Sequence, residues 1–359
     1  MNVSTYRGFI FPYTQARFLL AVAIMAIAAE LAASVSRPRR SAPRARRVPH
    51  SVIVLTALPG VFTATWLLAS GRSPLIDPNA FVHTSPKAVF LIETLFIPYA
   101  FLLGRSLASG FTRRRVFALA TLGLLLGASG YRGWIIIALA AYVGVRVMSM
   151  RLAAALWRGA VVVAATAGVL SLLAWYRREH SHHLVQLDTL LRAAGAESLG
   201  PIVGVVHIAI RESIALTQQL SERKAGGYGR SLFFADIWTV LPGYQESGGV
   251  TIAHVFGVYT GEGLTAGALG VLTHDYGFLG ALIILAIMAA VVGVVYTPTM
   301  RGGGAYRAAL YLIVFLFILH VFHRGILKIS YVVIPAALLV LFYAPRVIES
   351  TTRASLQRA

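Results

Sequence analysis

Side chains that could transfer protons lie mainly in the second half of the chain. The segment from Glu179 to Asp275 holds nine of the 13 acidic residues. Within it, three residues flank a Leu-Pro-Gly turn at 241–243 and are candidates for a general base: Glu246, His254 and Glu262. A carboxylate or an imidazole can remove the proton from an attacking hydroxyl group. The segment therefore predicts acid–base chemistry, with the choice among the three open.

Three arginines could bind a phosphate-bearing ligand near those bases: Arg132, Arg211 and Arg230. A guanidinium group donates paired, charge-assisted hydrogen bonds to phosphate oxygens and stabilises charge that develops on a leaving diphosphate. Arg132 follows a short apolar run at 116–130, which pulls its turn toward the hydrocarbon. Ionisable groups are costly there and are usually functional. The competing interpretation is that Arg132 extends to the membrane interface.

Four more polar residues could line a path for a second substrate: His207, Asp275, His323 and Arg324. His207 and Arg211 are one helical turn apart and so share a helix face. Each residue taken alone could equally be a solvated loop or interface residue. No metal is predicted, because the adjacent histidines 180, 182 and 183 lack the spacing of usual zinc sites and no matching ligands follow.

The composition is that of a helical membrane protein. Hydrophobic residues make up 57% of the chain and charged residues 13%, whereas a soluble domain has about half and about a quarter. The net charge of +19 is best explained by arginines on the cytoplasmic side, so no nucleic-acid partner is predicted. The absence of cysteine excludes disulfides and thiolate sites.

The apolar runs predict about nine transmembrane helices, since about 20 apolar residues cross the hydrocarbon. We place them at 18–35, 51–70, 88–109, 116–130, 133–147, 159–175, 278–296, 308–323 and 326–344. Arginines follow alternate spans, the densest group lying in a basic cytoplasmic loop at 36–50. The positive-inside rule then puts the N-terminus outside and the C-terminus in the cytoplasm. Two acids inside spans, Glu30 and Glu93, are interpreted as structural, paired with Arg105 or another buried base.

One large exterior loop at 176–266 completes a single integral membrane domain spanning 1–359. Four leucines at 184, 187, 190 and 191 fall on one helical face, and 202–220 is a second amphipathic helix that could lie along the membrane interface. The aromatic-rich stretch SLFFADIWTVLPGYQESGG is expected to be a re-entrant or interfacial element.

The second half of this loop resembles the Wzy-type O-antigen polymerases, also called oligosaccharide repeat unit polymerases. The resemblance rests on GGYGRSLFFADIWTVLPG at 226–243 and on the glycine-rich GEGLTAGALGVLTHDYGFLGA at 261–281, which contains the Tyr-Gly-x-x-Gly signature at 276–280. It covers the loop and the following span, and the family has a similar arginine at the exterior start of a span.

The resemblance implies a GT-C-like polymerase or ligase architecture and a membrane glycosyltransferase in the bacterial cytoplasmic (inner) membrane. The implied reaction polymerises polyprenyl-diphosphate-linked oligosaccharide repeat units for O-antigen or exopolysaccharide at the outer face. The donor is an undecaprenyl-diphosphate-linked glycan, and no nucleotide sugar, cofactor or metal is needed. Further implied partners are membrane lipid, a chain-length regulator and a flippase.

Three alternatives stay open from the sequence. An O-antigen ligase has a similar architecture but transfers finished polymer to lipid A core. A non-enzymatic lipid or polysaccharide transporter would show internal repeats and broken helices at mid-depth, and no repeat is visible. The sequence Gly-Ala-Ser-Gly at 127–130 is also the nucleophile signature of rhomboid proteases, but the candidate histidines sit at the ends of spans.

Overall fold

The protein is described by a computed structural model in which all the regular structure is helical. The described residues are 12–35, 50–77, 80, 84–130, 132–147, 154, 157, 159–161, 164, 168, 171–172, 175, 187–222, 231–240, 248–256, 266–300, 305–338 and 340–341. No strand occurs among them. The all-α prediction is confirmed.

Within the described part of the chain, five helical segments are long and apolar enough to cross a membrane, so the chain is an α-helical multi-pass membrane protein. They are α2 (Pro12–Val35), α3 (His50–Ala69), the pair α4 (Pro86–Glu93) and α5 (Phe96–Ser109), α12 (Gly267–Met300) and α13 (Ala305–Arg324). Two shorter helices lie among them, α6 (Arg113–Gly127) and α7 (Arg132–Val147). A further helix follows at 330–338. The total of nine spans stays a prediction.

The predicted span 88–109 is broken into α4 and α5 by a proline. Pro98 has no backbone N–H, so it cannot donate to the Thr94 carbonyl four residues earlier. Instead, Ile97 N donates to that carbonyl at 3.0 Å, and Tyr99 N donates to the Leu95 carbonyl at 3.1 Å. The break leaves Glu93 as the last residue of α4, buried inside the bundle.

The predicted start of the seventh span, at 278, matches the start of the second arm of α12, which follows a kink in that helix. α12 begins at Gly267, and the position near 278 is a kink at Gly277, whose φ of 73° and ψ of 168° are not helical. A positive φ favours glycine because it has no Cβ. The polar residues His274 and Asp275 lie in the first arm, before the kink, and the uninterrupted apolar run begins after it.

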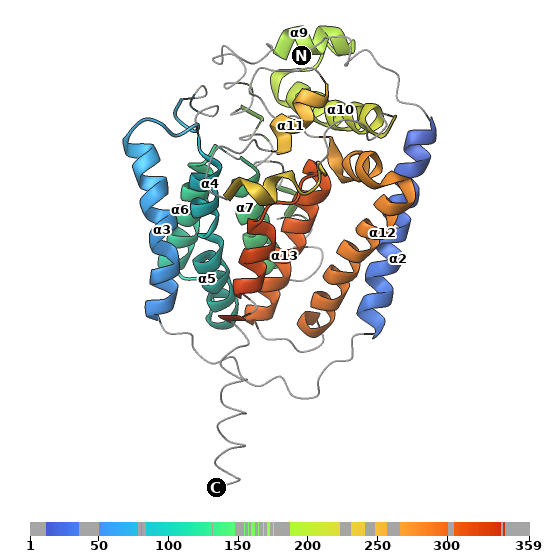
Figure 1. The fold of residues 1–359 in the computed structure, drawn as a ribbon. Coiled ribbons are helices and arrows are strands. Elements are labelled where there is room, and N and C mark those ends of the chain that lie inside the picture. The colour runs from blue at the N-terminus through green and yellow to red at the C-terminus, as the bar shows by residue number, and fades with distance from the viewer. Residues whose placement is uncertain are drawn as a thin grey trace.

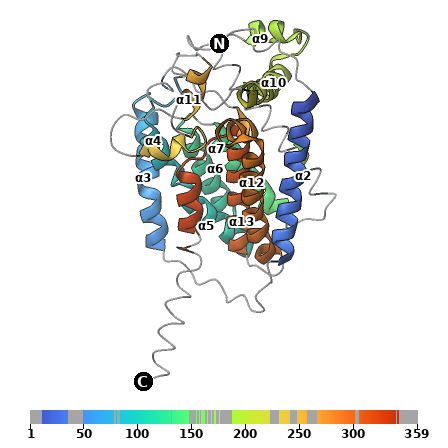
Figure 2. The ribbon, with the colours of Figure 1, turned by 45° about the vertical axis from the view of Figure 1, so that its right-hand side comes forward.

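Helix α2 packs mainly against α12, and both ribbon views show the two side by side (Figures 1 and 2). A Cβ at Gly293 would fall on the Ala29 carbonyl oxygen, so the backbones touch. The outer face of α12 exposes a stripe of large apolar side chains at four-residue spacing, Leu279, Ile283 and Ile287, as expected against lipid tails.

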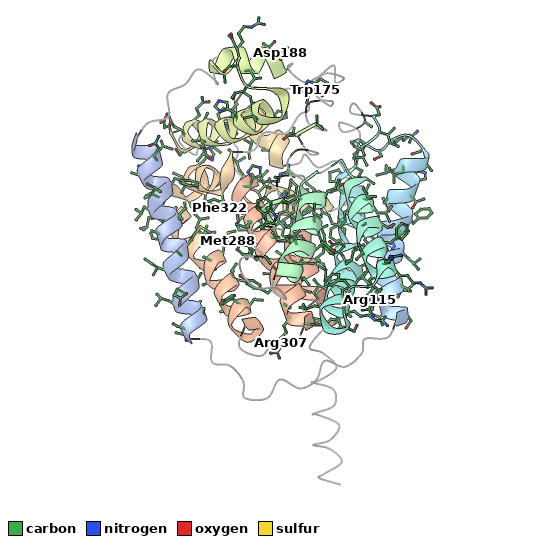
Figure 3. The ribbon with its side chains drawn as sticks, turned by 180° about the vertical axis from the view of Figure 1, so that it is seen from behind. Arg115, Trp175, Asp188, Met288, Arg307 and Phe322 are labelled. Carbon is green, nitrogen blue, oxygen red and sulfur yellow. The ribbon has the colours of Figure 1, made fainter. Side chains whose placement is uncertain are left out.

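The helices of the large loop lie over one end of the bundle (Figure 1). They are α9 (Leu187–Ala194) and α10 (Pro201–Glu222). α10 crosses the first turn of α12, where a Cβ at Gly270 would come within 2.8 Å of Thr217 Cα. Figure 3 shows Asp188 at this end of the bundle and Arg115 and Arg307 at the opposite end.

We expect Gly293→Ala to destabilise the protein, because the added methyl group would push α2 away from α12. Overpacking of this kind costs about 1–3 kcal/mol, which thermal unfolding in detergent would register as a lower Tm. The matched control is Gly168→Ala, a helical glycine whose Cβ would meet nothing within 4 Å. Equal Tm values for the two variants would contradict the close approach.

Candidate functional site

Half of the ten predicted site residues can be placed only in part or not at all. Arg230, Glu246 and Glu262 lie outside the described residues. Arg132 begins α7 and Arg211 lies in α10, but their side chains are outside the described part of the structure.

The other predicted residues lie at the end of the bundle that carries the loop helices. His254 is in α11 (Gly248–Val255) and is half-buried, as is His207 in α10. His207 Nε2 is buried with no hydrogen-bond partner among the described residues. His323 and Arg324 end α13, with His323 exposed and Arg324 half-buried.

A buried ion pair joins Glu93 at the end of α4 to Lys328, which follows α13. Lys328 Nζ lies 3.7 Å from Glu93 Oε1, and the two side chains are 11% and 2% exposed. Arg324 and Asp236 are further charged groups close enough to act electrostatically on Glu93. Glu93 therefore does have a basic partner, as expected, but this partner is Lys328; Arg105 is exposed on α5.

An aromatic cluster surrounds the ammonium end of this pair. Lys328 Nζ lies 5.9 Å from the centroid of the Trp134 ring, within the range of a cation–π interaction. Trp134 packs edge-on against Phe96 and Phe317, with ring centroids 5.4 and 5.8 Å away. The cluster also contains Tyr331, whose ring centroid is 5.7 Å from that of Trp134. Both charged side chains are thus largely shielded from bulk solvent.

Polar atoms are left without partners within the same region. Trp134 Nε1 and His320 Nε2 are buried and make no hydrogen bond among the described residues, and Ser330 lies beside the Glu93 carboxylate. Trp134 is 0% and Ser330 1% exposed. Native structures rarely leave buried polar atoms unsatisfied, so each needs an explanation such as a ligand or water. We call Glu93, Trp134, His320, Lys328 and Ser330 the buried polar centre.

Gly133 allows His320 to reach this centre. A Cβ at Gly133 would lie 2.6 Å from His320 Cε1, so the imidazole packs directly on the α7 backbone. The His320 ring then lies with its centroid 4.9 Å from that of Trp134. This contact joins α7 to α13 one residue after Arg132, at the turn that the sequence analysis selected.

The carboxylate of Asp275 forms hydrogen bonds with neighbouring residues. Its Oδ2 accepts hydrogen bonds from Ser231 Oγ at 2.7 Å and from the Phe233 N–H at 2.9 Å. Its Oδ1 lies 3.0 Å from His274 Nδ1. Tyr276 donates to Ser231 Oγ at 2.9 Å. The carboxylate thus fastens the segment that begins at Ser231 to the first arm of α12.

That segment continues into a short 3-10 helix, η2 (Ala235–Val240), which packs against α4. The Asp236 side chain is buried and accepts a hydrogen bond from Gly248 N at the start of α11. Residues 231–240 of the stretch expected to be re-entrant or interfacial therefore lie against the bundle beside Glu93, and its residues 241–247 lie outside the described part of the chain.

Sequence reasoning missed Lys328, Asp236 and His274 and treated Glu93 as structural. One signal was available for Lys328, because it is the only lysine within any of the nine predicted spans. An intramembrane lysine needs a carboxylate partner or a function. Ser129, in the rhomboid-like sequence, is buried and donates to the Leu126 carbonyl at 3.1 Å. That geometry gives the serine-protease alternative no support.

The centre combines an anion, a cation and hydrogen-bond donors in a desolvated environment. Such an arrangement could take a proton from a hydroxyl group or neutralise a phosphate oxygen. The described residues include no group of three potential metal ligands.

We expect Glu93→Gln and Lys328→Met each to reduce stability, by about 3–5 kcal/mol, because each leaves a buried charge without its partner. The double variant Glu93→Gln/Lys328→Met should recover more than half of the loss. Thermal or steric-trap unfolding of all four proteins gives the coupling. Additive single effects would show that the two charges do not interact.

Comparisons with known proteins leave the fold and the site without an established relative. The chain matches no family model, no curated protein and no solved structure.

Proposed function

We propose that the protein is a membrane glycosyltransferase that polymerises polyprenyl-diphosphate-linked oligosaccharide repeat units at the outer face of the bacterial cytoplasmic membrane. The observation that carries this proposal is the buried polar centre, which lies at the end of the bundle covered by the loop helices. The resemblance of 226–243 and 261–281 to oligosaccharide repeat unit polymerases supplies the substrate class.

The charges of the centre suit a diphosphate leaving group and a sugar hydroxyl nucleophile. Lys328 and Arg324 are cations at the end of α13, where they can offset negative charge that develops as the diphosphate departs. Glu93 is a carboxylate beside them, held in a region that excludes water. A base shielded from water can accept a proton from a sugar hydroxyl without exposing the donor to hydrolysis.

In the proposed reaction, the acceptor hydroxyl oxygen bonds to the anomeric carbon of the donor sugar while the bond from that carbon to the diphosphate breaks. The diphosphate leaves with the electron pair, and the hydroxyl proton passes to the base. Arg132, Arg211 and Arg230 hold the diphosphate in this scheme. Glu93 joins Glu246, His254 and Glu262 as a candidate base, and it is the one that lies in the centre.

The topology belongs to the same proposal. With nine spans, the start of α6 with Arg113 to Arg115 and the start of α13 with Arg307 face the cytoplasm, and α9 and α10 face the exterior. This places the centre near the outer surface, where a flipped lipid-linked unit would be presented.

A transporter is the second candidate function, because one observation favours it. Ion pairs buried within spanning segments often mark ion or substrate pathways, and Glu93 and Lys328 form such a pair. A transporter would move the lipid-linked glycan without changing its covalent structure.

The decisive experiment gives purified protein in nanodiscs a synthetic polyprenyl-diphosphate oligosaccharide without nucleotide sugar. We expect products spaced by whole repeat units on gels or in mass spectra. The Glu93→Gln/Lys328→Met variant, which keeps the charges balanced, should lose about 100-fold or more in rate, the typical contribution of acid–base catalysis. Wild-type rates in that folded variant would remove the centre from the reaction.

Two further assays distinguish the polymerase from a ligase and from a transporter. Turnover only when lipid A core is supplied would indicate a ligase. Translocation of intact lipid-linked glycan in proteoliposomes, with no new glycosidic bond, would indicate a transporter.

For the arginines, we expect Arg132→Ala, Arg211→Ala and Arg230→Ala to shorten the polymer in a complemented null strain, because each removes a donor to the diphosphate. Lysine variants should restore part of the length, since the charge remains but the paired geometry is lost. Full-length polymer from the Arg211→Ala strain would exclude that residue from the site.

A further inference from the structure

The buried polar centre is covered on one side by the segment 231–240. Leu232 and Phe233 at its start are 1% and 2% exposed. The Phe233 carbonyl accepts a hydrogen bond from Leu327 N at 2.8 Å, next to Lys328. Farther on, η2 packs against α4, and Asp236 acts electrostatically on Glu93. In Figure 1, η2 is the unlabelled gold helix that crosses between α4 and α13 beneath α11.

No substrate could reach the centre in this arrangement. Glu93, Trp134 and Ser330 are at most 1% exposed, so an oligosaccharide on a diphosphate could not touch them. The orphaned polar atoms nevertheless point to a ligand or water at this place. Part of the surrounding structure must therefore move before anything binds.

Most of the contacts around the centre join packed spanning helices, but the start of 231–240 is fastened by a small polar cluster. Asp275 accepts from both Ser231 Oγ and the Phe233 N–H, and Tyr276 adds a hydrogen bond to Ser231. Tyr276 is 41% exposed, so one edge of the cluster faces the surroundings. The cluster lies on the arm of α12 just before the kink at Gly277.

We infer that Asp275 is a positioning residue whose carboxylate holds segment 231–240 closed over the buried polar centre, and that substrate reaches the centre when these hydrogen bonds are released. The identity of the substrate rests on the proposed function. The closure itself does not, because it concerns access to a place that is buried whatever binds there.

The chain contains no cysteine, so single cysteines can report on access without a background. Ser330→Cys places a thiol in the centre by a conservative change. Ser106→Cys places one at a site that is equally buried, in α5, where the Ser106 hydroxyl bonds to the Leu102 carbonyl. The rate of modification by N-ethylmaleimide in nanodiscs measures how often each thiol becomes accessible.

We expect the thiol at 330 to react slowly in the otherwise unaltered protein and about tenfold faster when Asp275→Ala removes the charge-assisted hydrogen bonds. Ser231→Ala removes a smaller part of the cluster and should give an increase of about threefold. The thiol at 106 should stay slow in every background.

Three outcomes would overturn the inference. A fast reaction at 330 without the second substitution would show that the centre is not covered. Unchanged rates at 330 in both Asp275→Ala and Ser231→Ala would show that the cluster does not hold the cover. A parallel increase at 106 would mean that Asp275 stabilises the whole fold. Because labelling requires no turnover, these outcomes are decided even if the polymerisation assay fails.

Discussion

A carboxylate and an ammonium group buried side by side within a membrane protein constrain everything packed around them. Glu93 and Lys328 come from distant parts of the chain, and neither can be left without the other, because an isolated charge in a low dielectric is very costly. Their pairing therefore fixes α4 against the turn that follows α13. The break before Pro98 ends α4 at Glu93. The aromatic rings around Trp134 then complete the exclusion of water.

The loop helix α10, the start of α12 and the end of α13 next to Lys328 pack together through backbone contacts that only glycine permits. At Gly325, where φ is +74°, a Cβ would lie 2.6 Å from the Gly267 carbonyl oxygen. The first turn of α12 thus packs on the end of α13, and α10 crosses that same turn at Gly270. Close glycine contacts of this kind leave little room for sliding. The loop helix α10 and the helices α12 and α13 form one block, and the segment 231–240 is joined to that block at its start by hydrogen bonds to Asp275.

The sequence predicted the elements that uninterrupted apolar runs define. The expected spans 51–70 and 308–323 correspond to α3 (His50–Ala69) and α13 (Ala305–Arg324) within three residues at each end. It also placed the seventh span at 278–296, within the second arm of α12, but it did not predict the first arm, because His274 and Asp275 interrupt the apolar run. The centre could be predicted only in outline, since an acid and a lysine within spans each require a partner, but their pairing depends on tertiary contacts that no local spacing records. The diphosphate-binding roles of Arg132 and Arg211 stay predictions, because their side chains lie outside the described part of the structure.

Asp275 links the segment 231–240, which lies beside Glu93, to helix α12. The sequence analysis assigned it to a substrate path, yet its carboxylate is occupied by Ser231 and the Phe233 N–H. A residue whose acceptors are satisfied in this way positions its neighbours, and what it positions is the segment beside Glu93. An enzyme that uses a reactive lipid diphosphate must keep water from the donor until the acceptor is present. A cover whose start is fastened by hydrogen bonds meets that requirement in the proposed reaction, because a ligand that offers competing donors can weaken this attachment.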